Sequence, residues 1–123
     1  MFSKNTEKME SLIGANSKFV GDIDTKGTLR VDGTMEGNVN ADWVILGAKA
    51  YLKGDVISRG IIVGGRIDGN LRAKESVEIK PKGQVSGDIT TTKLTIIEGG
   101  VFDGRSFMQK SESKVVELQT KGG

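Results

Sequence analysis

Apolar and polar residues alternate in short stretches along most of the chain, and the stretches recur around regularly spaced glycines. Successive repeating glycines are separated by 16, 17, 15, 18 and 17 residues. They are Gly21, Gly37, Gly54, Gly69, Gly87 and Gly104. An apolar residue stands two positions before each of these glycines, and another apolar residue stands two positions after each of the first five. Because residues two apart point to the same face of a strand, the pattern predicts short strands with one buried face.

A second short strand is predicted between successive glycines. Its inward-facing pairs are Leu29/Val31, Val44/Leu46, Ile61/Val63, Val77/Ile79 and Leu94/Ile96. A period near 17 residues, with strands separated by glycine corners, is typical of a solenoid, in which stacked windings bury the apolar face that one winding alone would expose. We therefore expect an all-β fold, a parallel β-helix of about six short windings over residues 16–107, with flexible tails at residues 1–15 and 108–123.

The polar residue after each repeating glycine alternates between Asp and Asn. The series is Asp22, Asn38, Asp55, Asn70 and Asp88. If the windings are in register, these side chains stack, and a neutral amide between two carboxylates reduces the repulsion of like charges about 5 Å apart. The amides could also hydrogen-bond along the stack. A simpler explanation stays open, since Asp and Asn favour the position after a turn glycine.

The competing solenoid is the left-handed β-helix of the hexapeptide acyltransferases. Three hexapeptides would give a strict period of roughly 18 residues, with an aliphatic residue at every sixth position. The spacing here varies from 15 to 18 residues, and the chain has none of the His residues that those enzymes usually use. A right-handed or irregular β-helix is favoured.

Composition narrows the function. Only 36% of the residues are hydrophobic and 5% are aromatic, which suits a narrow aliphatic column better than a round core. The chain has no Cys and no His, so it suits a reducing cytosol and lacks the commonest general base and metal ligand. Its net charge of +2 comes from interleaved charges and does not predict nucleic-acid binding. We expect neither an enzyme nor a cofactor or metal site.

The stretches FVGDIDTKGTLRVDGTMEGNV, YLKGDV and EGGVFDGRSFM resemble the bactofilin family, over about residues 16–108. The resemblance implies a right-handed β-helix of triangular cross-section. It also implies a bacterial cytoskeletal protein that polymerises without nucleotide into non-polar filaments, through head-to-head and tail-to-tail contacts. Family members associate with the inner face of the cytoplasmic membrane through a short N-terminal peptide, and they position cell-wall or morphogenesis factors.

Polymerisation is also expected from the physics of a solenoid, because its end windings leave strand edges open and a slice of core uncovered. Alternatively, Phe102 and Phe107 could fold over one end and cap the rod. We predict contacts between copies of the chain at both ends. The predicted contact residues are Phe102, Phe107, Leu94 and Ile96 at the C-terminal end, and Phe19, Val20 and Ile23 at the N-terminal end.

The N-terminal tail carries Phe2 and Lys4 close to Met1. This pairing of apolar and basic residues resembles the family's membrane-targeting peptides, and it predicts contact with membrane lipid. One weak apolar anchor binds membranes only marginally, so polymerisation would have to add avidity. Alternatively, the tail is a plain terminus or a local cap on the first winding.

One strand face carries large apolar residues on its outer side. Trp43 and Ile45 would point outward, and Ile62 would stack beside Ile45 from the next winding. They predict a lateral patch for bundling or for a partner protein, although β-propensity alone also explains them. The rival function from another class is a non-polymerising β-helix module that binds carbohydrate or protein through the Trp43 face.

Overall fold

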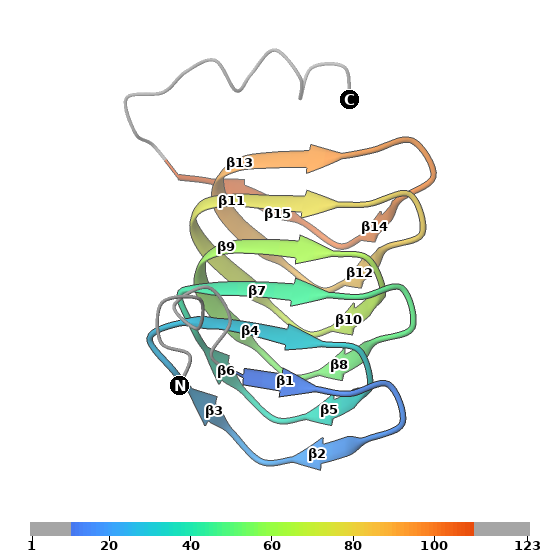
Figure 1. Ribbon diagram of the computed structural model, residues 1–123. Coiled ribbons are helices and arrows are strands. Elements are labelled where there is room, and N and C mark those ends of the chain that lie inside the picture. The colour runs from blue at the N-terminus through green and yellow to red at the C-terminus, as the bar shows by residue number, and fades with distance from the viewer. Residues whose placement is uncertain (1–10, 110–123) are drawn as a thin grey trace.

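The computed structural model describes residues 11–109, which form a right-handed parallel β-helix of six windings (Figure 1). No helix in this range is long and apolar enough to cross a membrane. The strands are β1 (Ser11–Ile13), β2 (Lys18–Val20), β3 (Ile23–Asp24), β4 (Thr28–Val31), β5 (Thr34–Glu36), β6 (Val39–Asn40), β7 (Trp43–Leu46), β8 (Tyr51–Lys53), β9 (Val56–Val63), β10 (Arg66–Asp68), β11 (Leu71–Ile79), β12 (Gln84–Ser86), β13 (Ile89–Ile96), β14 (Val101–Asp103) and β15 (Ser106–Met108).

The windings have three sides, which confirms the predicted fold class. The first side is a six-stranded parallel sheet of β2, β5, β8, β10, β12 and β14. The second side holds β3, β6, the first halves of β9, β11 and β13, and β15. The third side holds β1, β4, β7 and the second halves of β9, β11 and β13. The second and third sides join into one sheet because the long strands continue around the corner (Figure 1).

Columns of aliphatic side chains, one from each winding, fill the interior. On the third side, Leu29, Val44, Ile61 and Val77 stand in register and are fully buried. On the first side, Met35, Leu52 and Ile67 also stand in register and are fully buried. Each fully buried aliphatic side chain contributes roughly 1.5–3 kcal/mol of hydrophobic free energy. Stacked columns of this kind make a core without large aromatic residues.

The repeating glycines form a column of their own, and two physical requirements explain the residue type. Gly69 has a φ of +155°, a conformation that side chains with a Cβ rarely adopt. A Cβ at this position would also collide with the carbonyl oxygen of Gly54 in the winding before. The repeat of about 17 residues is therefore fixed by close backbone contact at one corner of each winding.

The β-helix begins at Ser11 instead of at residue 16, so part of the expected N-terminal tail belongs to the fold. β1 pairs in parallel with β4, and the side chain of Ile13 is buried beside Val31. Ile13 thereby covers one side of the first winding, which would otherwise be open. At the other end β15 continues to Met108. The remainder of both expected tails lies outside the described residues.

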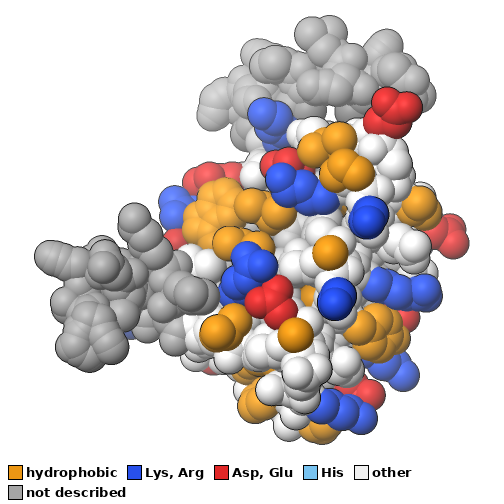
Figure 2. All heavy atoms as spheres, turned by 45° about the vertical axis from the view of Figure 1, so that its right-hand side comes forward, with side chains coloured by type: hydrophobic (Ala, Val, Ile, Leu, Met, Phe, Trp, Pro, Cys, Tyr) orange, Lys and Arg blue, Asp and Glu red, His pale blue; other side chains and the backbone are white. Residues whose placement is uncertain are grey.

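The outer surface is polar and mixed in charge. Figure 2 shows Lys and Arg side chains interspersed with Asp and Glu, and with single apolar side chains, over one face of the rod. Several opposite charges pair within or between windings, among them Lys18 with Glu36 and Arg66 with Asp68. Exposed pairs of this kind add little stability.

Candidate functional site

The C-terminal end of the rod exposes a slice of the core. Ile96 continues the column of Ile79, which is fully buried one winding earlier, yet 44% of the Ile96 side-chain surface is exposed. Met108 stands in register with the buried Thr91 and is itself 39% exposed. Both positions face inward, and no further winding covers them within residues 11–109. Leu94 and Phe102 lie at the same end, and both are partly buried against the core.

The N-terminal end repeats this arrangement on the first and second sides. Phe19 is 36% exposed, whereas Met35, its neighbour in the next winding, is fully buried. Ile23 is partly buried and continues the column of Val39. The backbone edges of β2 and β3 have no strand beneath them within the described residues. Each end thus combines open hydrogen-bonding edges with apolar side chains, the combination that accepts another chain.

Two of the predicted end residues point elsewhere, which corrects the sequence-based expectation. Phe107 is in register with Thr90, on the outer face of the second side, because its neighbours Ser106 and Met108 take the inward positions. The guanidinium group of Arg105 lies 5.6 Å from the centre of the Phe107 ring. Val20 is in register with Glu36 and likewise points outward. Phe107 therefore neither caps the core nor extends it.

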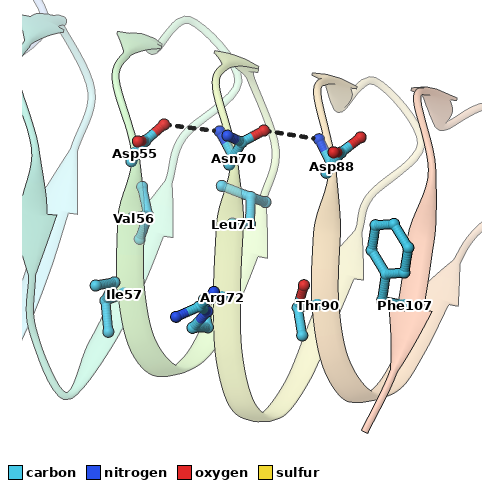
Figure 3. Close-up of a pocket in the computed structure, with 9 residues that line it drawn as sticks. All are labelled: Asp55, Val56, Ile57, Asn70, Leu71, Arg72, Asp88, Thr90 and Phe107. Carbon is cyan, nitrogen blue, oxygen red and sulfur yellow. Dashed lines mark hydrogen bonds between the residues drawn. The ribbon is translucent and has the colours of Figure 1, made fainter.

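The Asp and Asn residues that follow the repeating glycines stack in register, as expected (Figure 3). The hydrogen bonds differ from the expected amide ladder, because the Oδ1 of each of the first four side chains accepts from the backbone N–H of the next winding. The donor–acceptor distances are 2.9 Å for Asn38 to Asp22, 3.1 Å for Asp55 to Asn38, 3.0 Å for Asn70 to Asp55 and 3.0 Å for Asp88 to Asn70. The stack therefore joins five successive windings through their main chain.

An open groove runs along the second side. One hollow of about 400 Å³ has Asp55, Asn70 and Asp88 on one wall and Ile57, Arg72 and Phe107 on the other (Figure 3). A second hollow, of about 320 Å³, shares Asp55 and Ile57 and continues toward the first winding. The groove is shallow and follows the rod axis, so it suits an extended surface better than a small molecule.

The comparisons with known proteins agree with this geometry. The family model Bactofilin, described as polymer-forming cytoskeletal, matches residues 11–106. The chain is a bactofilin. The match begins at the first residue of β1 and so supports the earlier start of the fold.

Two curated relatives of this bactofilin come from Myxococcus xanthus (strain DK1622). Bactofilin BacO is 26% identical over 113 residues, with 90% of each chain covered. Bactofilin BacP is 33% identical over 91 residues, which cover 73% of this chain but only 36% of BacP. The chain therefore spans about a third of BacP and most of BacO.

A solved structure shares the fold. It is a cryo-EM reconstruction of Thermus thermophilus bactofilin double helical filaments, and it superposes with a TM-score of 0.71 at 21% identity. The match covers 80% of this chain and 99% of the Thermus chain. At this identity the likeness establishes the β-helix and leaves the contacts between subunits to be argued from this bactofilin's own residues.

The predicted lateral patch lies on the third side of the rod. Ile45 and Ile62 are neighbours in adjacent windings, as expected. Trp43 lies across Gly60, and the Arg59 guanidinium stands 5.9 Å from its ring centre. Arg59 in turn donates to both carboxylate oxygens of Asp42. All three patch residues are half-buried, so Trp43 serves mainly to fill the space that Gly60 leaves.

The bactofilin family is structural and cytoskeletal. Among residues 11–109, no group of three or more His, Cys, Asp or Glu side chains could hold a metal ion. The carboxylates of the second side are instead engaged as main-chain acceptors, as at Asp22 and Asp55. Open strand edges next to partly exposed inward-facing apolar side chains are found at the two ends of the described rod.

Proposed function

We propose that this bactofilin self-assembles without nucleotide into filaments by stacking the ends of its β-helix. The observation that supports this proposal most directly is the partial exposure of Ile96 at the C-terminal end, since Ile79, its neighbour in the winding before, is fully buried. An added copy would bury this slice and pair the open strand edges, so both hydrophobic burial and hydrogen bonding favour stacking. The proposal needs no nucleotide, since every contact in it is made by protein groups.

The non-polar arrangement, in which like ends meet, is proposed from the family resemblance. Contacts between like ends are isologous, so the same residues appear on both partners of each contact. Head-to-tail stacking would instead continue the parallel windings from one copy to the next. The two arrangements differ in axial repeat, which is two rods in the first case and one rod in the second.

The end contact is tested by a substitution at Ile96 with a matched control. Ile96→Arg places a charge on the uncovered slice, whereas Val101→Arg places the same charge on the outward face of the last winding. Ile96 is 44% exposed and Val101 51% exposed, so neither substitution removes a fully buried side chain. Negative-stain electron microscopy should show filaments for the parent and for Val101→Arg, and short particles for Ile96→Arg. Equal filaments from both variants, with unchanged melting temperatures, would remove the end from the assembly contact.

We further propose that the filament lies at the inner face of the cytoplasmic membrane and positions cell-wall or morphogenesis factors there. Met1, Phe2 and Lys4, the proposed lipid contacts, lie outside the described residues. The proposal is supported by the family resemblance and by the pairing of an apolar and a basic residue at the N-terminus. A filament would repeat this weak anchor many times, which raises the overall affinity.

Co-sedimentation with vesicles that contain anionic lipid tests the membrane contact. The intact chain should pellet with the vesicles, and a chain without residues 2–8 should stay largely in the supernatant while still forming filaments. Equal pelleting of the two proteins would count against the N-terminal anchor.

A further inference from the structure

Two large apolar side chains stand exposed in one outward column of the second side. Ile57 on β9 is 50% exposed, and Phe107 on β15 is 47% exposed. Arg72 and Thr90 occupy the same column on the two strands between them. Figure 3 shows this row along one wall of the groove.

A second outward column lies two residues earlier, at the positions that directly precede the same strands. From β9 to β15 it reads Asp55, Asn70, Asp88 and Arg105. The order is carboxylate, amide, carboxylate, guanidinium, so the charge reverses between the first and the last of these windings. Arg105 already lies 3.5 Å from Asp88 of its own chain, which shows that it extends along this column.

We propose that the second sides of two copies pack against each other in antiparallel orientation, about a two-fold axis between β11 and β13. This axis brings β9 of one copy opposite β15 of the other, and β11 opposite β13. Ile57 then meets Phe107 of the second copy, and Asp55 meets Arg105 of the second copy. By the same symmetry Asn70 meets Asp88, and Arg72 meets Thr90, so every contact occurs twice.

Three of these four contacts are complementary. The exposed aliphatic side chain covers the exposed ring, and the carboxylate faces a guanidinium of opposite charge. The Asn70 amide can donate to the free carboxylate oxygen of Asp88, because Asp88 contributes only its backbone N–H to the stack. The column after the glycines thus matches along the whole contact, and the second column matches where Ile57 meets Phe107.

The parallel alternative fits less well. A two-fold axis along the rod would exchange the two columns, so that Asp55 of one copy faced Ile57 of the other. A carboxylate against an aliphatic side chain loses hydration without gaining a partner. The order of residues in the two columns therefore favours the antiparallel pair.

The contact spans four windings, a length of roughly 14 Å at the usual strand spacing. A contact of this length buries less surface area than a stable interface between two free proteins requires. The inference therefore rests on the proposed function, since a weak contact holds firmly when a filament repeats it along its length. It assigns the second side of the rod to filament pairing, in place of the third side around Trp43.

Thiol cross-linking tests the pairing directly, because the natural chain contains no Cys. Facing sheets lie about 10 Å apart, which is too far for a disulfide, so a short bis-maleimide is the suitable reagent. Ile57→Cys and Phe107→Cys chains, one of them tagged, are mixed in equal amounts before assembly. The control mixture replaces Phe107→Cys by Val101→Cys, which lies in the same winding and is similarly exposed but faces the first side.

The proposal expects the mixed Ile57–Phe107 product to exceed the control product several-fold. It also expects that product to exceed the Ile57–Ile57 product, which a parallel pair would favour. Equal yields in the two mixtures would overturn the proposal. Electron microscopy of the same samples separates the two ideas, because filaments without the mixed product contradict only the pairing, and the mixed product without filaments contradicts only end-to-end assembly.

Discussion

At the residue scale, the Asp and Asn stack shows which property of these side chains the fold uses. The first four residues each accept a hydrogen bond at Oδ1 from the backbone of the next winding, and Asp and Asn provide this acceptor equally well. Hydrogen bonding therefore does not require the alternation. The repulsion between carboxylates explains the alternation. Alternate carboxylates stand about 10 Å apart, near the Debye length at 0.1 M salt, whereas adjacent carboxylates would stand about 5 Å apart and repel each other more strongly.

Asn70→Asp tests this account. The substitution keeps the acceptor oxygen and creates three consecutive carboxylates, so the free energy of unfolding should fall by roughly 1 kcal/mol or less at neutral pH and low salt. High salt should recover the loss. Urea denaturation at two salt concentrations measures the effect, with Asn70→Ala as the control that loses the acceptor under both conditions. Parent-like stability of Asn70→Asp at low salt would favour the simpler preference of Asp and Asn for turns.

The residue scale also shows where the sequence misleads. Phe107 is apolar and stands in the last winding, so its hydrophobicity predicted an end contact. The strand alternation places it outward instead, since Thr90 occupies the matching outward position one winding earlier. Ile89 and Thr91 are buried, and Ser106 and Met108 occupy the matching positions one winding later. Aligning these two pairs in the sequence would have shown that Phe107, which lies between Ser106 and Met108, points outward.

At the element scale, side-chain contacts on the first side tie successive strands together. The Tyr51 hydroxyl on β8 donates to an Asp68 carboxylate oxygen on β10 at 2.7 Å. This hydrogen bond is the main reason that the pKa of Asp68 is lowered and that of Tyr51 is raised, and Arg66 also lowers the pKa of Asp68. Because the Asp68 pKa is lower in the folded state, its stabilising effect is present above the ordinary carboxyl pKa near 4 and is lost as the pH falls through the folded value.

Tyr51→Phe removes the hydroxyl and keeps the ring. The pKa of Asp68, measured by NMR titration, should rise toward its ordinary value, and the melting temperature at pH 7 should fall. The difference in melting temperature from the parent should shrink as the pH falls through the lowered Asp68 pKa of the folded parent, because below that pKa Asp68 is protonated in both proteins. An unchanged Asp68 pKa would show that the neighbouring cations Arg66 and Lys53 lower it without the Tyr51 hydroxyl.

Most elements could be predicted from the repeat, because the inward pairs such as Leu29/Val31 and Val44/Leu46 are buried as expected. β1 was missed for a physical reason. Its single core residue, Ile13, precedes the first repeating glycine, so the periodicity had no earlier winding to compare it with. Its place is decided by pairing with β4, a contact between residues 18 apart in sequence.

At the scale of the whole molecule, the period of the repeat predicts the number of windings. The ends are harder to predict, since the exposure of Ile96 or Phe19 depends on what stacks above or below it. The described rod has the same backbone hydrogen-bonding edges at its ends as it has between its windings. In the proposed filament, these open edges would be covered by the end of another copy.

X-ray fibre diffraction from aligned filaments tests this central claim most directly. If the rods stack end to end, the strands run across the filament, and a meridional reflection at about 4.8 Å is expected. Six windings at that spacing make a rod of roughly 29 Å, so contacts between like ends predict an axial repeat of roughly 58 Å. A 4.8 Å reflection on the equator would mean that the rods lie across the filament, and it would contradict assembly through the β-helix ends.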